Sequence, residues 1–380
     1  MSTKAVASEM RICLDGRMLS DACAGTGIGQ FARTVVAALH GIDVYPTILE
    51  DGGSAMHRSQ SAKLLMAAQP WRRHSMVSER GFFVRDVFRE AQVFFDIHKR
   101  PMPVVLPGPP GIMHWTYPLP LRIIGWRNLY TVHDVLPLDP AIPSPVNGPR
   151  LRRLLEALRA AGGNFTTVSN AACAQILDRM GWSENAVTPC HQAVNVAGAT
   201  EGTLPAGLQR GAYLLYVGAV EARKNLHRLL EAYRASGITT PLVISGPDGL
   251  GAASIDAQIA ATAGAIRLGL QPRGTVLQLL ANARALVFVS LAEGFGLPVA
   301  EAMALGTPVL AANVPALAEV ADGASLLTDP LDLTALQHAL MTIDGDAALR
   351  TRLSALGIER ARHFALAPYA QRLLTLYGVA

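Results

Sequence analysis

Two glutamates flank a short glycine-containing segment in the last third of the sequence. It reads Glu293-Gly-Phe-Gly-Leu-Pro-Val-Ala-Glu301 and follows the apolar run Ala285–Val289. Pro298 favours the first turn of a helix, because its φ angle is already helical and its missing N–H is not needed there. The backbone N–H groups at such a helix start, beside the small residues Gly294 and Gly296, suit phosphates and hydroxyls. The glutamate segment, residues 293–301, therefore predicts a site for a polar ligand.

The two carboxylates of the glutamate segment are charged hydrogen-bond acceptors eight positions apart. Charged acceptors bind hydroxyl groups more strongly than neutral ones, so Glu293 and Glu301 could hold two different sets of sugar hydroxyls. A sugar nucleotide offers a hexose and a ribose. Taken singly, Glu293 would also fit a surface loop and Glu301 the first turn of a helix. The spacing favours a binding site, in which we also include Gly294, Phe295, Gly296 and Leu297.

A basic pair lies at a second turn from strand to helix. Arg223 and Lys224 follow the apolar run Tyr213–Val217, and Asn225, a residue type common at helix N-caps, precedes the helical pattern Leu226–Ala235. The positive end of a helix dipole favours anions, so a diphosphate could bind there. A lone basic pair in a loop is more often solvated surface. The place of this pair in the same half of the chain as the glutamate segment favours the interpretation as a diphosphate site.

Glycines cluster near the start of the sequence as well. Gly25-Thr-Gly27-Ile-Gly29 lies between the expected strand Arg11–Leu14 and the helical pattern Gln30–His40. It resembles half of a dinucleotide fingerprint, but the G-x-G-x-x-G spacing and the acidic residue about 20 positions later are missing. A nicotinamide cofactor is therefore not indicated. The glycines predict either a structural turn or a turn that a phosphate or an acceptor sugar can approach.

Histidines offer the remaining candidates in the first half. His133 follows the apolar run Leu129–Val132 and stands beside Asp134. Ends of buried strands are where open α/β sheets bind ligands, so His133 could be a general base or a hydrogen-bond donor to a sugar hydroxyl. A structural histidine fits equally well. His114 is weaker still, because the segment Pro101–Pro120 is rich in Pro and Gly and is expected to be loop around a short strand at 111–114.

Composition excludes several classes of protein. Half of the 380 residues are hydrophobic and 16% are charged, which is typical of a well-packed α/β enzyme. No Ser-His-Asp order, G-x-S-x-G, P-loop or HExxH is present. The four cysteines lack CxxC pairing, and no Asp-x-Asp pair follows a strand, so we expect neither a metal ion nor another cofactor. Without a signal sequence or a spanning apolar run, a cytoplasmic protein is expected.

Strand-length apolar runs alternate with helical patterns, which predicts parallel sheets with crossover helices. Gly, Ala, Thr and Pro accumulate without apolar periodicity between Asn195 and Gly211, the best linker candidate. The α/β pattern then restarts with strands expected at 213–217, 241–244, 285–289 and 308–310. We therefore expect a loose leader at 1–10, one domain at 11–197, a second at 208–362, and a cleft between two doubly wound lobes.

These motifs together resemble the family 4 retaining glycosyltransferases, which include bacterial mannosyltransferases of the GT-B fold. The matching residues follow in order along nearly the whole chain, and the second half is the specific part: Gly27-Ile-Gly29, Thr131-Val-His133-Asp134, Thr167-Val-Ser169, Tyr216-Val-Gly218, Arg223-Lys224-Asn225, Ser245-Gly246 and residues 293–301. The sequence departs from the family pattern at Val289, where Pro is frequent. Residues 52–109 have no feature that aligns.

The resemblance implies two Rossmann-like domains, a donor bound mainly by the second, and a final helix within 363–380 that crosses back to the first. It implies that Arg223 and Lys224 hold the donor diphosphate, Glu293 the hexose and Glu301 the ribose. Gly218 and Gly246 would line the donor, and Gly27, Gly29 and His133 the reacting face. The anomeric configuration would be retained without a carboxylate nucleophile, with the departing diphosphate stabilised by the basic pair.

The preferred donor is GDP-mannose and the preferred acceptor a lipid-linked glycan of exopolysaccharide or lipopolysaccharide assembly. A UDP-hexose donor, a sugar-nucleotide epimerase of the same fold and a catalytically idle binding subunit stay as alternatives. Residues 1–190 hold 20 Lys and Arg against 15 Asp and Glu. The basic side chains of this half could face an anionic inner membrane or be solvated surface. They include Arg72, Arg73, Lys99 and Arg100 and those of the stretch 150–159. No nucleic-acid partner is expected.

Overall fold

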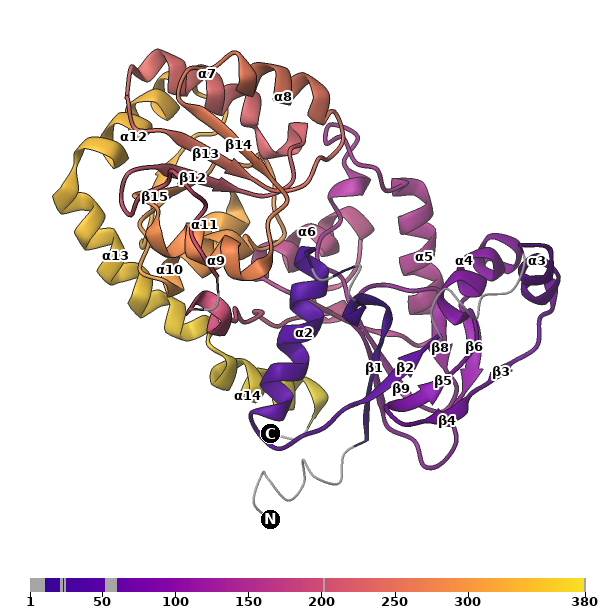
Figure 1. Cartoon of the computed structure of the whole chain (residues 1–380). Coiled ribbons are helices and arrows are strands. Elements are labelled where there is room, and N and C mark those ends of the chain that lie inside the picture. Colours follow the sequence, from indigo (N-terminus) through magenta and orange to yellow (C-terminus); the bar gives the residue numbers. More distant parts are fainter. Residues whose placement is uncertain (1–10, 21–22, 24, 52–59, 201, 379–380) are drawn as a thin grey trace. The chain divides into compact units, whose positions relative to one another are not determined.

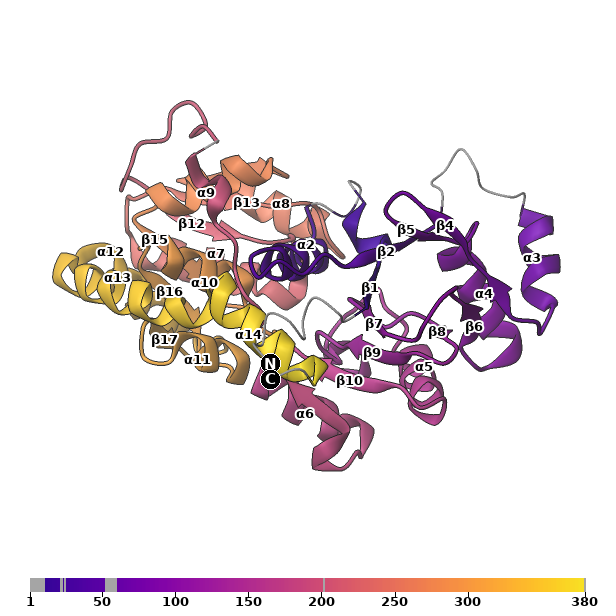
Figure 2. The same cartoon turned by 90° about the horizontal axis from the view of Figure 1, so that it is seen from below.

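The computed structural model describes the chain except residues 1–10, 21–22, 24, 52–59, 201 and 379–380, so the expected leader lies outside the described residues. The chain divides into two compact units. Unit 1 comprises 1–138, 146–192 and 369–380, and unit 2 comprises 139–145 and 193–368. Figure 1 and Figure 2 show the elements of both from two directions. Each unit is described by itself below.

Unit 1 is built on an eight-stranded sheet with the order β11-β10-β9-β7-β1-β2-β5-β4 among the described residues. All neighbours in it are parallel except β4 and β5. Its strands are β1 Ile12–Asp15, β2 Thr47–Glu50, β4 Met76–Ser78, β5 Gly81–Phe83, β7 Ile112–Trp115, β9 Arg127–Thr131, β10 Asn164–Thr167 and β11 Val187–Pro189. The helices are α2 Gly27–His40, α3 Gln60–Ala68, α4 Val87–His98, α5 Gly148–Ala160 and α6 Asn170–Met180, and α14 Leu366–Tyr377 joins unit 1 from Tyr369 on.

Within Pro101–Pro120, the short strand expected at 111–114 is confirmed within one residue by β7, but the expectation of loop around it is wrong. The stretch contains β6, Met102–Val105, and β7, and β6 lies between β3, Arg73–His74, and β8, Leu121–Ile123, in a small separate sheet. Pro103 fits inside β6 because its missing N–H lies on the side of β3. The very short β3 pairs only with Val104 and the residue after it, so no hydrogen bond is lost at Pro103. Proline density in the sequence therefore concealed β6.

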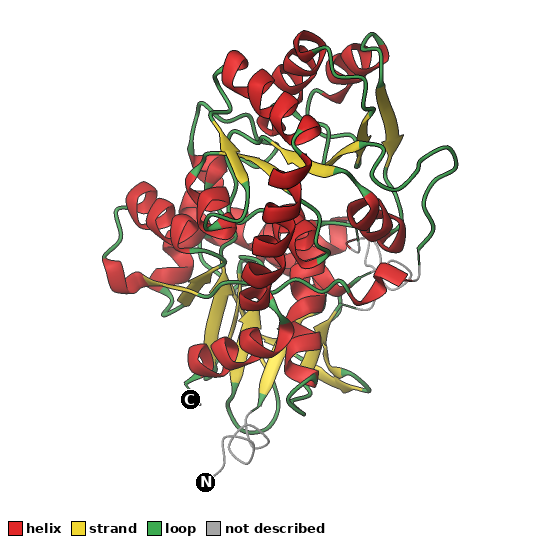
Figure 3. Cartoon of the chain, turned by 90° about the vertical axis from the view of Figure 1, so that its left-hand side faces the viewer, coloured by secondary structure: helices red, strands yellow, loops and turns green. Residues whose placement is uncertain are grey.

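Unit 2 is built on a six-stranded sheet whose neighbours are all parallel, with the order β14-β13-β12-β15-β16-β17 among the described residues. Its strands are β12 Leu214–Val217, β13 Leu242–Ser245, β14 Ala265–Gly269, β15 Ala285–Phe288, β16 Val309–Ala312 and β17 Leu326–Thr328. Its helices are α7 Leu226–Ser236, α8 Ala252–Ala260, α9 Arg273–Asn282, α10 Leu297–Ala304, α11 Pro315–Ala321, α12 Leu333–Gly345 and α13 Ala347–Ala361. Figure 3 shows helices lying against the strands in both units.

The strand order of unit 2 reverses direction between β12 and β15. Counted along the chain, the six strands lie in the order 3-2-1-4-5-6, which is the order of a dinucleotide-binding Rossmann sheet. At such a switch point the loops that follow the two central strands leave on opposite sides and open a crevice, where ligands bind. The predicted α/β class with doubly wound domains is thus confirmed, and the topology points to the loops after β12 and β15.

The end of the chain is anchored within unit 1. The side chain of Tyr377, at the end of α14, lies 2.8 Å from Nδ1 of His114 on β7. Arg127 on β9 donates to the carbonyl oxygens of Leu376 and Tyr377 at 2.9 and 3.0 Å, which satisfies acceptors that a helix end leaves open. His114 is therefore a buried residue of a central strand, which corresponds to the short strand expected at 111–114.

Candidate active site

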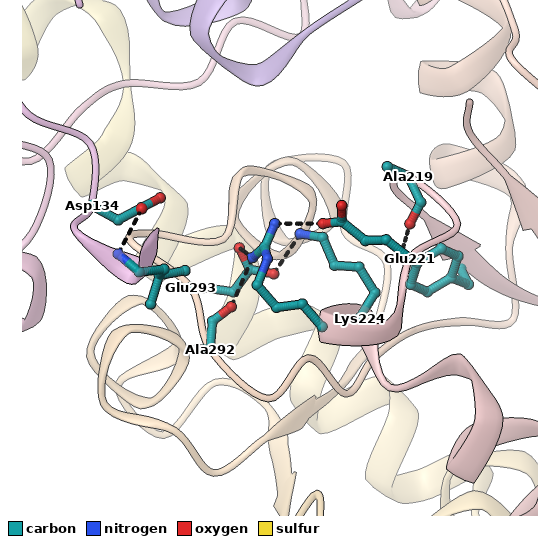
Figure 4. Close-up of polar contacts among 9 residues, drawn as sticks. Asp134, Ala219, Glu221, Lys224, Ala292 and Glu293 are labelled. Carbon is teal, nitrogen blue, oxygen red and sulfur yellow. Dashed lines mark hydrogen bonds and ion pairs between the residues drawn. The ribbon is translucent and has the colours of Figure 1, made fainter. Parts of the chain in front are cut away.

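The loops after β12 and β15 meet in unit 2. The backbone N–H of Leu291 donates to the carbonyl oxygen of Arg223 at 2.9 Å, so the basic pair and the glutamate segment are parts of one site. Lys224 Nζ lies 2.6 Å from one oxygen of Glu293, and Arg223 Nη1 lies 3.3 Å from the other. Figure 4 shows this cluster, in which Arg223 also pairs with Glu221 at 2.7 Å. The charges of the two cations and the two carboxylates thus balance.

Burial alone would raise the pKa of Glu293, whose side chain is 10% exposed. The charges of Lys224 and Arg223 outweigh burial and leave that pKa below its ordinary value. Glu293 is therefore ionised at neutral pH. Lys224 is also held from the other side, because its ammonium group lies 5.3 Å from the centre of the Phe288 ring. The cluster is a fixed array of charges at the end of the sheet.

Asn225 does not cap its helix as expected. It adopts a left-handed conformation with φ of 61°, and its side chain makes no hydrogen bond to the backbone of α7. Its amide instead donates to the carbonyl oxygen of Pro330 at 2.7 Å and accepts from Arg228 at 3.1 Å. The residue therefore fixes the turn that carries Lys224.

The glycines of unit 2 are required by close backbone contacts. A Cβ atom on Gly246 would lie 2.0 Å from the carbonyl oxygen of Gly218, so the loops after β12 and β13 touch. Gly296, with φ of 104°, precedes α10 directly, and a Cβ atom there would meet Leu317 at 2.4 Å. Packing thus accounts for Gly246 and Gly296, both of which are buried.

The turn before α10 is otherwise largely buried. Phe295 packs edge-on against Phe364, with ring centres 5.4 Å apart, and is 4% exposed. Its side chain belongs to the core, so only its backbone could reach a donor. Gly294 is buried and Leu297 is half-buried. Pro298 occupies the first turn of α10, as the sequence predicted.

Glu301 is held by a residue that the sequence analysis missed. Its carboxylate is 5% exposed and accepts from Arg273 Nη2 at 2.6 Å. Arg273 begins α9 and also donates to the carbonyl oxygen of Asn195 at 3.1 Å. No local signal could have joined Arg273 to Glu301, because 28 residues and a strand separate them. The chain buries a second carboxylate with its own cation, at the opposite end of the glutamate segment.

In unit 1, Gly27 and Gly29 do not form a turn before the helix, because α2 begins at Gly27. The side chain of Thr26 accepts from the backbone N–H of Gly29 at 3.0 Å and caps the helix. A Cβ atom on Gly29 would lie 1.9 Å from the carbonyl oxygen of Cys23, so packing excludes any side chain there. Gly27, in contrast, is exposed at a helix N-terminus, where backbone N–H groups face outward.

His133 follows β9, the neighbour of β7 in the unit 1 sheet, whose strand order reverses between β1 and β7. Its Nε2 is 2.9 Å from the carbonyl oxygen of Thr116, the residue after β7, so Nε2 carries the proton and Nδ1 is an acceptor. Burial lowers the pKa of His133 to about 4. The ring is therefore neutral at pH 7 and is suited to accept a hydrogen bond rather than to donate a proton.

A buried carboxylate supports this histidine. Asp15, at the end of β1, accepts from the backbone N–H and the hydroxyl of Thr116 at 2.5 and 2.8 Å. Its other oxygen has no hydrogen-bond partner among the described residues, and burial raises the pKa of Asp15 to about 6. Phe31 packs edge-on against His133 with ring centres 4.7 Å apart. Asp15 and Phe31 thus position His133, and neither was singled out from the sequence.

Among the described residues, no three His, Cys, Asp or Glu side chains come together as metal ligands. No helix there is long and apolar enough to cross a bilayer.

Known proteins resemble both the sequence and the structure. Residues 208–360 match the family described as Glycosyl transferases group 1. O-antigen chain mannosyltransferase B of Escherichia coli is 38% identical over 160 residues, which cover 40% of this chain and 42% of that protein. O-antigen chain mannosyltransferase RfbU of Salmonella typhimurium is 30% identical over 141 residues, 35% of this chain and 38% of the relative. The chain thus spans less than half the length of these curated relatives.

Solved structures resemble nearly the whole chain. Sucrose-phosphate synthase from Thermosynechococcus elongatus has a TM-score of 0.69 at 20% identity, over 97% of this chain and 98% of that one. HepE of Anabaena, solved with UDP and glucose, has a TM-score of 0.65 at 14% identity, over 98% of this chain and 100% of that one. At these identities the likeness shows the fold. The chain therefore has the GT-B fold, and its residues 208–360 match the family of glycosyl transferases group 1.

Proposed function

We propose that this protein is a retaining glycosyltransferase that takes a hexose from a nucleotide sugar. The observation that carries the proposal is the cluster of Arg223, Lys224 and Glu293 at the switch point of a Rossmann sheet, inside the segment that matches the glycosyltransferase family. Cations at this position suit a diphosphate, and a buried carboxylate beside them suits the hydroxyls of the sugar attached to it. The site therefore recognises both sides of the bond that breaks.

The charges suggest how the donor binds. Glu293 forms an ion pair with Lys224, and Glu293 and Glu221 both pair with Arg223. An incoming diphosphate would compete for the two cations and release the oxygens of Glu293 toward the hexose. As the glycosidic bond breaks, negative charge grows on the diphosphate, where the cations stabilise it. We propose that these cations do this without a metal ion, and that the leaving phosphate takes the acceptor proton during transfer on the same face.

The preferred donor is GDP-mannose and the preferred acceptor a lipid-linked glycan of lipopolysaccharide or exopolysaccharide assembly. Two relatives named as O-antigen chain mannosyltransferases support this choice. A UDP-hexose is the second candidate, because a solved structure of the same fold is a complex with UDP-glucose. Relatives named D-inositol 3-phosphate glycosyltransferase, such as that of Corynebacterium efficiens at 41% identity over 90 residues, leave other acceptors open.

Substitution of Lys224 tests the transfer reaction. Lys224→Ala should lower turnover at least about a hundredfold, because it removes a buried cation from the charge that develops in the transition state. Arg234→Ala, on the last turn of α7, is a control that leaves the cluster intact. Folding is checked by thermal melting. Near-normal turnover of a folded Lys224→Ala protein would overturn the assignment.

A donor screen tests the identity of the sugar nucleotide. A ligand that binds the folded protein raises its melting temperature, so GDP-mannose, UDP-glucose, UDP-galactose and UDP-N-acetylglucosamine are compared at equal concentration. We expect stabilisation by GDP-mannose, and a response to UDP-sugars alone would reverse the donor choice. Conversion of the nucleotide sugar without any acceptor would instead indicate an epimerase.

A further inference from the structure

The edge of unit 1 carries an unusually basic and apolar segment. Between Asp51 and Glu79 the sequence has no Asp or Glu, but it has Arg58, Lys63, Arg72 and Arg73. The described part of the segment forms α3, a turn at 69–72, β3 and β4. Figure 1 and Figure 2 both show α3 beside α4. None of this lies within residues 208–360, so the family match does not account for it.

Arg73 fixes this segment from the inside, which corrects the expectation that it belongs to a basic surface. Its guanidinium is buried and lies 2.6 Å from the buried carboxylate of Glu90 on α4. It also donates to the carbonyl oxygens of Trp71 at 2.7 Å and Met66 at 2.5 Å. A buried ion pair costs desolvation, so it is most useful where one conformation must be specified. Here it locks the end of α3 and the turn onto α4.

The locked turn presents large apolar side chains to solvent. Trp71 is 66% exposed, Leu64 and Leu65 on α3 are 57% and 67% exposed, and Ile97 on α4 is 44% exposed. A flexible loop could turn such side chains inward. The clamp at Arg73 prevents this for the turn, so the exposure of Trp71 is built into the fold.

Positive side chains border the same residues. Arg72, Lys99 and Arg100 are exposed, and Arg100 donates to the carbonyl oxygen of Pro70 at 3.2 Å, next to Trp71. The exposed acid nearby on α4, Asp96, is paired with Arg150 at 2.9 Å. This surface, which we call the α3–α4 face, is thus apolar with a positive border. It is formed by Leu64, Leu65, Trp71, Arg72, Ile97, Lys99 and Arg100.

We propose that the α3–α4 face binds the surface of an anionic lipid bilayer. Tryptophan prefers the boundary between lipid and water, leucines enter the acyl region, and Lys and Arg attract anionic headgroups. Charge complementarity singles out this partner, because an uncharged or acidic-bordered surface would not select for anionic lipid. The inference rests on the proposed function only in that a lipid-linked acceptor would lie in the same membrane.

The experiment is sedimentation of the full chain with vesicles, without donor or acceptor, so that it does not depend on transferase activity. Vesicles of phosphatidylcholine with 30% phosphatidylglycerol are compared with phosphatidylcholine alone. We expect binding to the anionic vesicles only, weakened by salt. Leu65→Ser with Trp71→Ser should weaken it at least about tenfold. Arg72→Gln with Arg100→Gln should weaken it about twenty-fivefold, because each basic side chain contributes about fivefold.

Matched controls lie on unit 2. Leu331→Ser changes a side chain that is 62% exposed, and Arg210→Gln changes an exposed arginine, so neither should alter vesicle binding. Thermal melting establishes that each variant is folded, and ultracentrifugation gives its oligomeric state. The proposal is wrong if the wild-type chain ignores anionic vesicles or if the α3–α4 variants bind as well as the wild type. Dissociation of a dimer by those variants would assign the face to a second copy of the chain instead.

Discussion

Removal of the Glu293 charge should make the enzyme bind free GDP more tightly while it loses turnover. Glu293 forms ion pairs with Lys224 at 2.6 Å and with Arg223 at 3.3 Å. Glu293→Gln keeps the shape of the side chain but frees both cations for the diphosphate. Two unit charges 4 Å apart interact by about 1 kcal/mol in water and about 4 kcal/mol near a protein surface. Since Glu293 is 10% exposed, we expect a gain in binding free energy of about 1–3 kcal/mol, which corresponds to roughly fivefold to 150-fold tighter binding of GDP.

Isothermal titration with GDP measures this change. The pKa of Glu293 lies below its ordinary value, so the carboxylate is charged and the gain should be constant between pH 6.5 and 8.5. Turnover with the donor sugar should fall, because the amide is a weaker acceptor for hexose hydroxyls. Glu359→Gln, an exposed acid paired with Arg362 in the same unit, is the control. Equal or weaker GDP binding by folded Glu293→Gln would refute the idea that carboxylate and diphosphate compete.

Three further substitutions test the surrounding structure. If Arg273 acts by orienting Glu301 toward the ribose, Arg273→Met should weaken the binding of GDP about tenfold or more. The binding of 2′,3′-dideoxy-GDP, measured in the same titration, should not change. The pKa of Asp15 is raised from 3.8 to about 6, so folding favours its protonated form and its contribution to stability is lost as pH rises through that range. Denaturant titration should therefore show that the free energy of unfolding of Asp15→Asn, relative to that of the wild type, rises by up to about 3 kcal/mol between pH 4 and pH 8. Tyr377→Phe should lower the free energy of unfolding by about 1–3 kcal/mol in the same assay, because it leaves Nδ1 of buried His114 unpaired.

The sequence was informative where structure is local. The strands at 214–217, 242–245 and 285–288 were predicted within one residue, because buried parallel strands read as continuous apolar runs. The edge strands β14 and β17 were missed. β14 is only partly buried and does not form such a run, and β17 is only three residues long. The glycines and Pro298 marked the two loops at the switch point correctly, since both residue types act on the backbone of their own turn.

What the sequence could not show are the partners that come from distant elements. The ion pairs of Arg273 with Glu301 and of Arg73 with Glu90 join separate helices and strands, and nothing in the local pattern marks either arginine as the partner of a buried carboxylate. The expectation of independent roles for the basic pair and Glu293 failed to anticipate that they neutralise each other. Burial decides these contacts, because a charge removed from water must find an opposite charge nearby.

The two ends of the glutamate segment are held by cations from different parts of unit 2. Lys224 and Arg223 come from the loop after β12, whereas Arg273 comes from the start of α9. Between them lies the first part of α10, where Val299 and Ala300 are fully buried and cannot shift without breaking the core. The separation of the two carboxylates is therefore set by packing, not by the ligand. A donor that uses both must span a fixed distance between hexose and ribose, so the segment selects the length of the phosphate bridge even though neither glutamate contacts the base in our proposal.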